Sequence, residues 1–233
     1  MKKRFFLIIS YCMIIAMFIV GIYSGSHAVT VMVEGAPIRR QCTIVIDAGH
    51  GGIDGGATSC TGKLESSFNL EIALRLRDLF HLLGYDTKMI RTSDISVYTK
   101  GETIAQQKIS DLRQRVKIIN ETENALLLSI HQNNFTDSRY SGAQVFFGQE
   151  EGSEALAKSL QKAFVEHLNP GSKRQCKRSE GIYLMEHINR PGVLIECGFL
   201  SNPEEETKLR DPEYQKKLCC VMVSTVTTFL SNT

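Results

Sequence analysis

The stretch CTIVIDAGHGG, residues 42–52, decides how the rest of the chain is interpreted. Its first five residues are small, apolar or β-branched, which is typical of a short buried strand. The strand leads into Asp47 and then into a loop where glycines lie on both sides of His50. Glycines allow tight turns and close approach of other groups. An imidazole in a tight loop directly after a buried strand indicates a functional site at that strand end.

Outward from this stretch, apolar spacing predicts alternating strands and helices. A helix over 66–83 is capped by Ser66 or Ser67 and ended by Gly84. The other predicted helices are 109–120, 153–168 and 212–230. The predicted strands are 42–46, 85–91, 125–130, 143–147, 181–185 and 192–195. This order predicts a single α/β domain with a mostly parallel central sheet and helices on both faces.

The amino terminus has the features of a targeting segment. Three basic residues at positions 2–4 precede residues 5–23, which carry no charge. That run is just long enough to span a bilayer, so it is either an uncleaved anchor or the core of a signal peptide cleaved after Ala28. Either hypothesis places the rest of the protein outside the cytoplasm, tethered to the membrane or secreted. We therefore divide the chain into a signal or anchor (1–28), a linker (29–41) and a folded α/β domain (42–230).

Composition and charge indicate a folded domain and argue against nucleic acid as a binding partner. The chain has 233 residues, 42% of them hydrophobic and 22% charged, which suits a folded domain and excludes wholesale disorder. Formal net charge is +2, but from residue 29 onward 24 basic residues face 25 acidic ones. That balance of −1 gives no general attraction for nucleic acid, so we predict none as a partner.

The seven cysteines show no C-x-x-C pattern, which argues against a cysteine zinc site. Cys42 and Cys197 lie in or beside predicted strands, where a small buried thiol is common. Cys219 and Cys220 are adjacent and cannot easily pair with each other. We predict that most of the cysteines are free thiols.

Three chemically active residues follow predicted strands: His50, His131 and Glu196. The carboxyl ends of parallel strands share one edge of a sheet, so these residues should converge there. Two histidines with one carboxylate are a common ligand set for catalytic zinc. The residues alone leave the carboxylate open among Asp47, Asp54, Glu65 and Glu196.

The sequence resembles the zinc-dependent N-acetylmuramoyl-L-alanine amidases of bacterial cell walls. The resemblance begins with IVIDAGHGGIDGGA (44–57) and continues in order over about residues 42–230. Its further segments are Glu65 with Asn69-Leu70, RTSD (91–94), LRQRVKIIN (112–120), SIHQN (129–133), GAQVFF (142–147) and PGVLIECGFLSN (191–202).

The resemblance implies a role for four residues. His50, Glu65 and His131 would bind Zn²⁺, and Glu196 would be the catalytic carboxylate. The substrate would be peptidoglycan, cut at the amide between N-acetylmuramic acid and the L-alanine of the stem peptide. Zinc polarises such a carbonyl and lowers the pKa of water to about 7, and a nearby carboxylate can transfer the protons.

Several alternatives stay open. Within the family, the short layout resembles sporulation amidases that help form muramic δ-lactam in the spore cortex, which would place the enzyme in the forespore or cortex space. A vegetative autolysin or division amidase is the alternative. Two alternatives lie further from the amidase function. They are a zinc peptidase acting on another amide and a catalytically inactive wall-binding domain.

We also expect an activating or placing protein partner. In this division the catalytic domain would fill the chain after the linker, so we expect no separate wall-binding module. The loop between Gly51 and Glu65 contains five glycines, so its ordering costs conformational entropy that a partner could offset. Timed expression alone is the simpler alternative.

Overall fold

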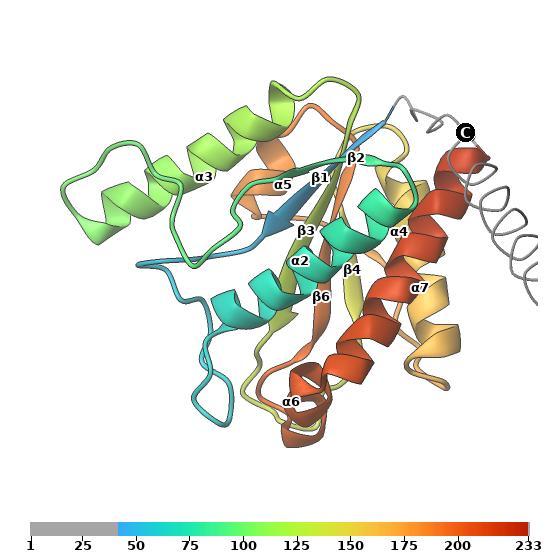
Figure 1. Ribbon diagram of the computed structural model, residues 1–233. Coiled ribbons are helices and arrows are strands. Elements are labelled where there is room, and N and C mark those ends of the chain that lie inside the picture. The colour runs from blue at the N-terminus through green and yellow to red at the C-terminus, as the bar shows by residue number, and fades with distance from the viewer. Residues whose placement is uncertain (1–41, 233) are drawn as a thin grey trace, which may run out of the picture. The chain divides into compact units, whose positions relative to one another are not determined.

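The computed structural model describes residues 42–232, and the strand predicted from residues 42–46 lies inside its central sheet (Figure 1). This strand, β1 (Thr43–Ala48), pairs in parallel with β2 (Asp86–Met89) and β3 (Ala125–Asn133). β3 pairs in parallel with β6 (Gly192–Phe199). The sheet order is β2-β1-β3-β6-β4-β5.

The far edge of the sheet departs from the parallel pattern. β4 (Gln144–Phe147) runs antiparallel to β6, and the two-residue β5 (Lys177–Arg178) is parallel to β4. The first residue of β4 therefore lies opposite Glu196. The prediction of an α/β fold with a mostly parallel sheet is confirmed.

Six helices flank the sheet among residues 42–232. Their bounds are α2 (Glu65–Leu82), α3 (Ile104–Asn120), α4 (Ser153–His167), α5 (Tyr183–His187), α6 (Pro203–Arg210) and α7 (Pro212–Ser231). α2, α4 and α7 pack together on one face, and α3 packs with α5 on the other (Figure 1).

The core lies in two layers because side chains alternate across the buried strands. In β1, Ile44 and Ile46 join the large cluster under α2, α4 and α7, while Val45 joins the smaller cluster under α3 and α5. Both faces are apolar, as a parallel sheet covered on both sides requires. The buried central strands hold the sheet edge on which the functional residues lie.

Several predicted bounds were wrong for local reasons. α2 starts at Glu65 after Leu64, and no serine side chain caps it. α3 starts five residues before Ile109 because Thr103 and Gln106 form a capping box. Residues 181–185 are not a strand: α5 begins at Tyr183.

The amino-terminal predictions lie outside the described residues. The signal or anchor (1–28) and the linker (29–41) are not among them. Between residues 42 and 232, no helix combines the length and apolar character needed to cross a bilayer. The cysteines in this part of the chain are free thiols, as predicted.

Candidate metal centre and active site

The carboxyl ends of β1, β3 and β6 bring the three predicted strand-end residues to one edge. Ala48 at the end of β1 lies opposite Ile130 of β3, and His131 lies opposite Glu196 of β6. His50 follows β1 by two residues. The register of parallel strands thus joins parts of the chain that are more than sixty residues apart.

His50, Glu65 and His131 form a compact cluster. One nitrogen or oxygen from each lies within 4.8 Å of the others, and no other such group of three is found among residues 42–232. Glu65 bridges the histidines: its Oε2 is 3.2 Å from His50 Nε2, and its Oε1 is 2.9 Å from His131 Nδ1. Of the four carboxylates left open by the sequence, Glu65 is the one that belongs to this cluster.

The glycine-rich loop returns to place Glu65 at the start of α2. The Glu65 backbone N–H donates to Ala57 O at 2.8 Å, and Ala57 N–H donates to Glu65 Oε2 at 3.0 Å. Gly56 has a φ of 69°, and a Cβ there would lie 2.6 Å from Glu65 Oε2. Glycine is needed at this position because both the backbone conformation and the space exclude a side chain.

Asp54 orients His50 from the outer side. Asp54 Oδ2 lies 2.8 Å from His50 Nδ1, and Lys108 Nζ lies 2.9 Å from Asp54 Oδ1. Burial opposes the charged imidazole of His50, but hydrogen bonds and charge from Glu65 and Asp54 outweigh it and raise its pKa to about 9. With Nδ1 engaged, Nε2 is the atom that His50 presents to the cluster.

His131 is held by close packing and by the groups around Glu65. A Cβ on Gly49 would lie 2.1 Å from His131 Nε2, so only glycine fits beneath the ring. Buried Asn69 donates to Gly49 O and Glu65 Oε1, and Gln132 donates to Asn69 Oδ1. These bonds fix the carboxylate of Glu65 and the loop before His50 in one network.

Glu196 differs from the other carboxylates of the site. Its Oε2 is buried and has no hydrogen-bond partner among the described residues. Burial, helped by the charge of Glu65, raises its pKa to about 7 against the lowering effect of His131 and His50. A carboxyl group with this pKa can both accept and release a proton near neutral pH.

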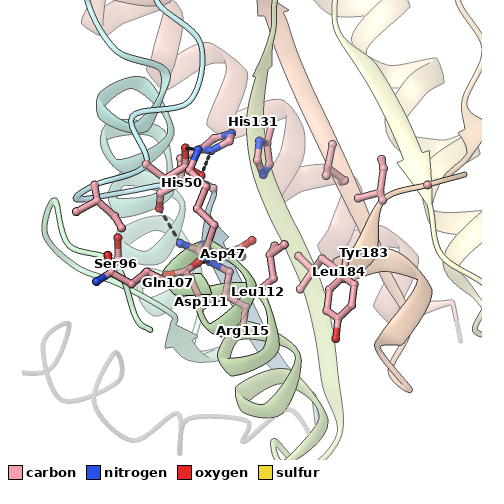
Figure 2. A pocket seen from close by; sticks show the side chains of 17 residues that line it. Asp47, His50, Ser96, Gln107, Asp111, Leu112, Arg115, His131, Tyr183 and Leu184 are labelled. Carbon is pink, nitrogen blue, oxygen red and sulfur yellow. Dashed lines mark hydrogen bonds and ion pairs between the residues drawn. The ribbon is translucent and has the colours of Figure 1, made fainter. Parts of the chain in front are cut away.

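A pocket of about 390 Å³ opens beside the two histidines (Figure 2). Figure 2 shows Asp111, Leu112 and Arg115 of α3 below the histidines, with Tyr183 and Leu184 of α5 across from them. The pocket thus lies between α3 and α5 on the side of the smaller core layer. The segment wrongly predicted as a strand supplies one of its walls.

Two buried arginines support the site. Both lie in segments that carry the family resemblance, RTSD (91–94) and LRQRVKIIN (112–120), but the sequence assigned no role to either. Arg115 forms ion pairs with Asp47 and Asp111 and donates to His50 O at 2.7 Å. Asp47 also accepts from Ser129 Oγ at 2.7 Å, so it is a structural partner and lies outside the cluster. Arg91 donates to Ala48 O and Gly49 O of the same segment. Their signal was a basic residue within an otherwise apolar or helical segment, which is too common to interpret alone.

Comparison with known proteins places this geometry in a family. The family of N-acetylmuramoyl-L-alanine amidases matches residues 44–227. The chain belongs to this family. It is an enzyme of the amidase class, and its substrate is peptidoglycan.

Individual relatives narrow the comparison. The germination-specific N-acetylmuramoyl-L-alanine amidase of Bacillus subtilis (strain 168) is 44% identical over 178 residues, covering 75% of this chain and 74% of that protein. The CwlD amidase from Clostridioides difficile, solved in complex with the GerS lipoprotein, has a TM-score of 0.79 and 36% identity, covering 82% of this chain and all of that one. An N-acetylmuramoyl-L-alanine amidase from Clostridium difficile 630 has a TM-score of 0.71 and 28% identity, covering 82% and 98%.

Proposed function

We propose that this amidase is zinc-dependent, with His50, Glu65 and His131 as ligands and Glu196 as the catalytic carboxylate. The observation that carries the proposal is the cluster of two imidazoles and one carboxylate, with Glu196 opposite His131 on the next strand. Two histidines with one acidic ligand leave a coordination position open, as catalytic zinc sites do.

The residues fit such an ion. Glu65 Oε2 and Oε1 already lie 3.2 and 2.9 Å from the two histidine nitrogens, close to the spacing between ligands of one small ion. Asp54 supports His50 as carboxylates commonly support zinc-binding histidines. The buried Oε2 of Glu196, which has no partner among residues 42–232, is a further sign of a site built for another group.

Glu196 would move the protons of the reaction. Bound zinc supplies a Lewis acid for the amide carbonyl and lowers the pKa of water to about 7. The Glu196 carboxylate takes the proton from the attacking water and delivers it to the departing amide nitrogen. Burial raises the pKa of this carboxyl in the metal-free site to about 7 and so favours uptake of that proton. The adjoining pocket gives room for part of the wall substrate.

Single substitutions test the assignment. Replacing His50, Glu65 or His131 with Ala should lower zinc content, measured by atomic absorption, together with release of stem peptides from purified wall. Glu196→Gln should abolish release and leave zinc content unchanged. Zinc loss in Glu196→Gln with retention in Glu65→Ala would show that the two glutamates have been exchanged.

We further propose a role in the spore cortex. The support is the 44% identity to a germination-specific amidase and the similarity to the CwlD amidase. Muramic δ-lactam should be missing from spores of a strain lacking the gene and should return with the wild-type gene but not with Glu196→Gln. Normal δ-lactam with defective separation of growing cells would favour a vegetative role instead.

We also propose that the chain is exported and works with a protein partner. Export rests on the basic and apolar residues 2–23, and fractionation with amino-terminal sequencing distinguishes an anchor from cleavage after Ala28.

The partner is supported by the complex of the CwlD amidase with GerS. Tight zinc binding and full wall cleavage by the purified chain alone would argue against an activating partner.

A further inference from the structure

Arg91 is a buried arginine whose donors are all directed at backbone carbonyls. It follows β2, and only 2% of it is exposed. Its Nε donates to Ala48 O at 2.8 Å, and its Nη1 donates to Ser93 O at 3.0 Å. Its Nη2 donates to Gly49 O at 3.0 Å and to Ser66 O at 2.8 Å. One side chain therefore joins the end of β1, the start of α2 and its own loop.

The two acceptors of Nη2 are neighbours of the proposed ligands. Gly49 directly precedes His50, and Ser66 directly follows Glu65. A single nitrogen thus links the two segments whose separation sets the distance between the His50 and Glu65 side chains. The planar guanidinium is suited to this because it presents several donors in a fixed geometry, whereas a lysine offers them from one point.

The loop that Arg91 holds has a backbone conformation that needs support. His50 has a φ of 61°, in the left-handed region that costs a residue with a side chain about 1–2 kcal/mol. Two arginines hold this segment through its carbonyl groups. Arg91 donates to the carbonyls of Ala48 and Gly49, and Arg115 donates to those of Ala48 and His50. Three consecutive carbonyls, ending with that of His50 itself, are therefore fixed.

The free-energy cost of burying the Arg91 guanidinium indicates that this side chain does more than fill space in the core. Arg115 is balanced by ion pairs with Asp47 and Asp111. Within residues 42–232, no carboxylate lies within ion-pair distance of Arg91. A buried cation without a direct counter-ion is expensive, and an apolar side chain would fill the same volume without that expense.

We propose that Arg91 is a positioning residue that fixes the separation of His50 and Glu65 before the metal binds. The inference rests on the proposed zinc site. Without the guanidinium, the loop of His50 and the first turn of α2 lose their shared donor. The ligands must then be brought into place at the expense of binding free energy. Partners outside the ligand set typically change metal affinity 10–100-fold.

The test measures the zinc affinity of wild type and of Arg91 variants, each as the full-length chain purified in detergent. Affinity is measured by competition with a chromophoric zinc chelator. Arg91→Lys and Arg91→Met should each bind zinc about 10–100-fold more weakly than wild type, with Arg91→Met the weaker. The lysine variant keeps the charge, so it remains informative if the methionine variant does not fold. Circular dichroism and thermal unfolding of the metal-free proteins report the fold separately.

Gln215→Met is the matched control. Gln215 is also buried and joins separate elements, donating to Leu209 O at 2.8 Å and accepting from Arg75 Nε at 2.9 Å, but none of its partners is a direct neighbour of a proposed ligand in the chain. It should lower thermal stability and leave zinc affinity within about twofold of wild type. Equal zinc affinity in wild type and both Arg91 variants would overturn the inference, as would equal weakening in Gln215→Met. Absence of zinc binding in wild type, or its retention in His131→Ala, would overturn the proposed ligand set and this inference with it.

Discussion

At the scale of single residues, Gly49 determines how closely the loop after β1 can approach His131. The space for a Cβ at Gly49 is taken by the imidazole, with Nε2 at 2.1 Å and Cε1 at 2.3 Å. Real side chains do not tolerate such distances, so any residue other than glycine must displace the ring or the loop. The position of the His131 imidazole therefore depends on the lack of a side chain at Gly49 as well as on β3.

Gly49→Ala should therefore damage the site more than the fold. We expect a loss of about 1–3 kcal/mol in the free energy of unfolding, together with lower zinc content. Gly148→Ala is the control, because the atoms nearest to a Cβ there are Met185 Cε and Met185 O, both at 3.4 Å. Urea unfolding and metal analysis of both variants check the prediction. Full zinc content in Gly49→Ala would contradict it.

The pKa of His50 predicts how metal binding depends on pH. Without metal, His50 holds a proton up to a pKa of about 9, and that proton must leave before Nε2 can bind an ion. Apparent zinc affinity should therefore rise with pH, by up to about tenfold per unit, until the pH reaches about 9. Asp54→Asn removes one of the negative charges that raise this pKa, so its affinity should level off at a lower pH. Zinc affinity independent of pH between 6 and 9 would contradict this ionisation scheme.

At the scale of elements, α6 anchors the glycine-rich loop that carries the chain from His50 to Glu65. Buried Glu206 of α6 accepts from Ser59 Oγ at 3.2 Å and from Thr61 Oγ1 at 2.5 Å. The backbone of Cys60 donates to Leu200 O at 3.0 Å. The entropy cost of ordering this loop, for which the sequence suggested a protein partner, is thus offset in part by the chain itself.

Glu206→Ala should loosen that loop. Two hydroxyls would lose a charged acceptor, which should cost about 1–3 kcal/mol in the free energy of unfolding. Hydrogen exchange of the amides in residues 57–64 should accelerate more than exchange in the central strands. Glu204→Ala, on the exposed side of the same helix, serves as the control. Unchanged exchange in 57–64 would show that the loop does not depend on α6.

At the scale of the whole molecule, the fold rests on the two apolar layers around the sheet, and the metal would add to it. The core contains large, fully buried helical side chains such as Phe68, Phe80 and Phe164. The histidines and Glu65 also satisfy one another without an ion. The metal-free protein should therefore remain folded.

Metal removal should lower the melting temperature without unfolding the chain. A ligand present at 100 times its Kd stabilises the folded state by about 2.7 kcal/mol, which corresponds to roughly 5–10 °C for a domain of this size. Thermal unfolding with zinc and with EDTA should show this shift in wild type, and His131→Ala should show little of it. Loss of far-ultraviolet circular dichroism in EDTA at 25 °C would mean that the fold itself requires the metal.

The sequence by itself determined the alternation of strands and helices, and hence the edge where the site lies. Apolar β-branched runs such as residues 43–46 must be buried wherever they lie, and residues that follow such strands meet at one edge. His50 and His131 were predictable from this rule alone. Resemblance to a family was needed to choose Glu65 among four carboxylates, because its approach depends on a loop whose path has no periodic pattern.

Only the tertiary structure decided what surrounds these residues. α5 replaced a predicted strand because five residues are too few for periodicity to distinguish the two. Arg91 and Arg115 gained their roles from carbonyl groups distant in sequence, and Gly49 from the ring of His131. Hydrogen bonds and close contacts of this kind depend on positions in space, which local sequence patterns do not record. The sequence therefore determined where the chemistry gathers, and packing determined the geometry in which it is held.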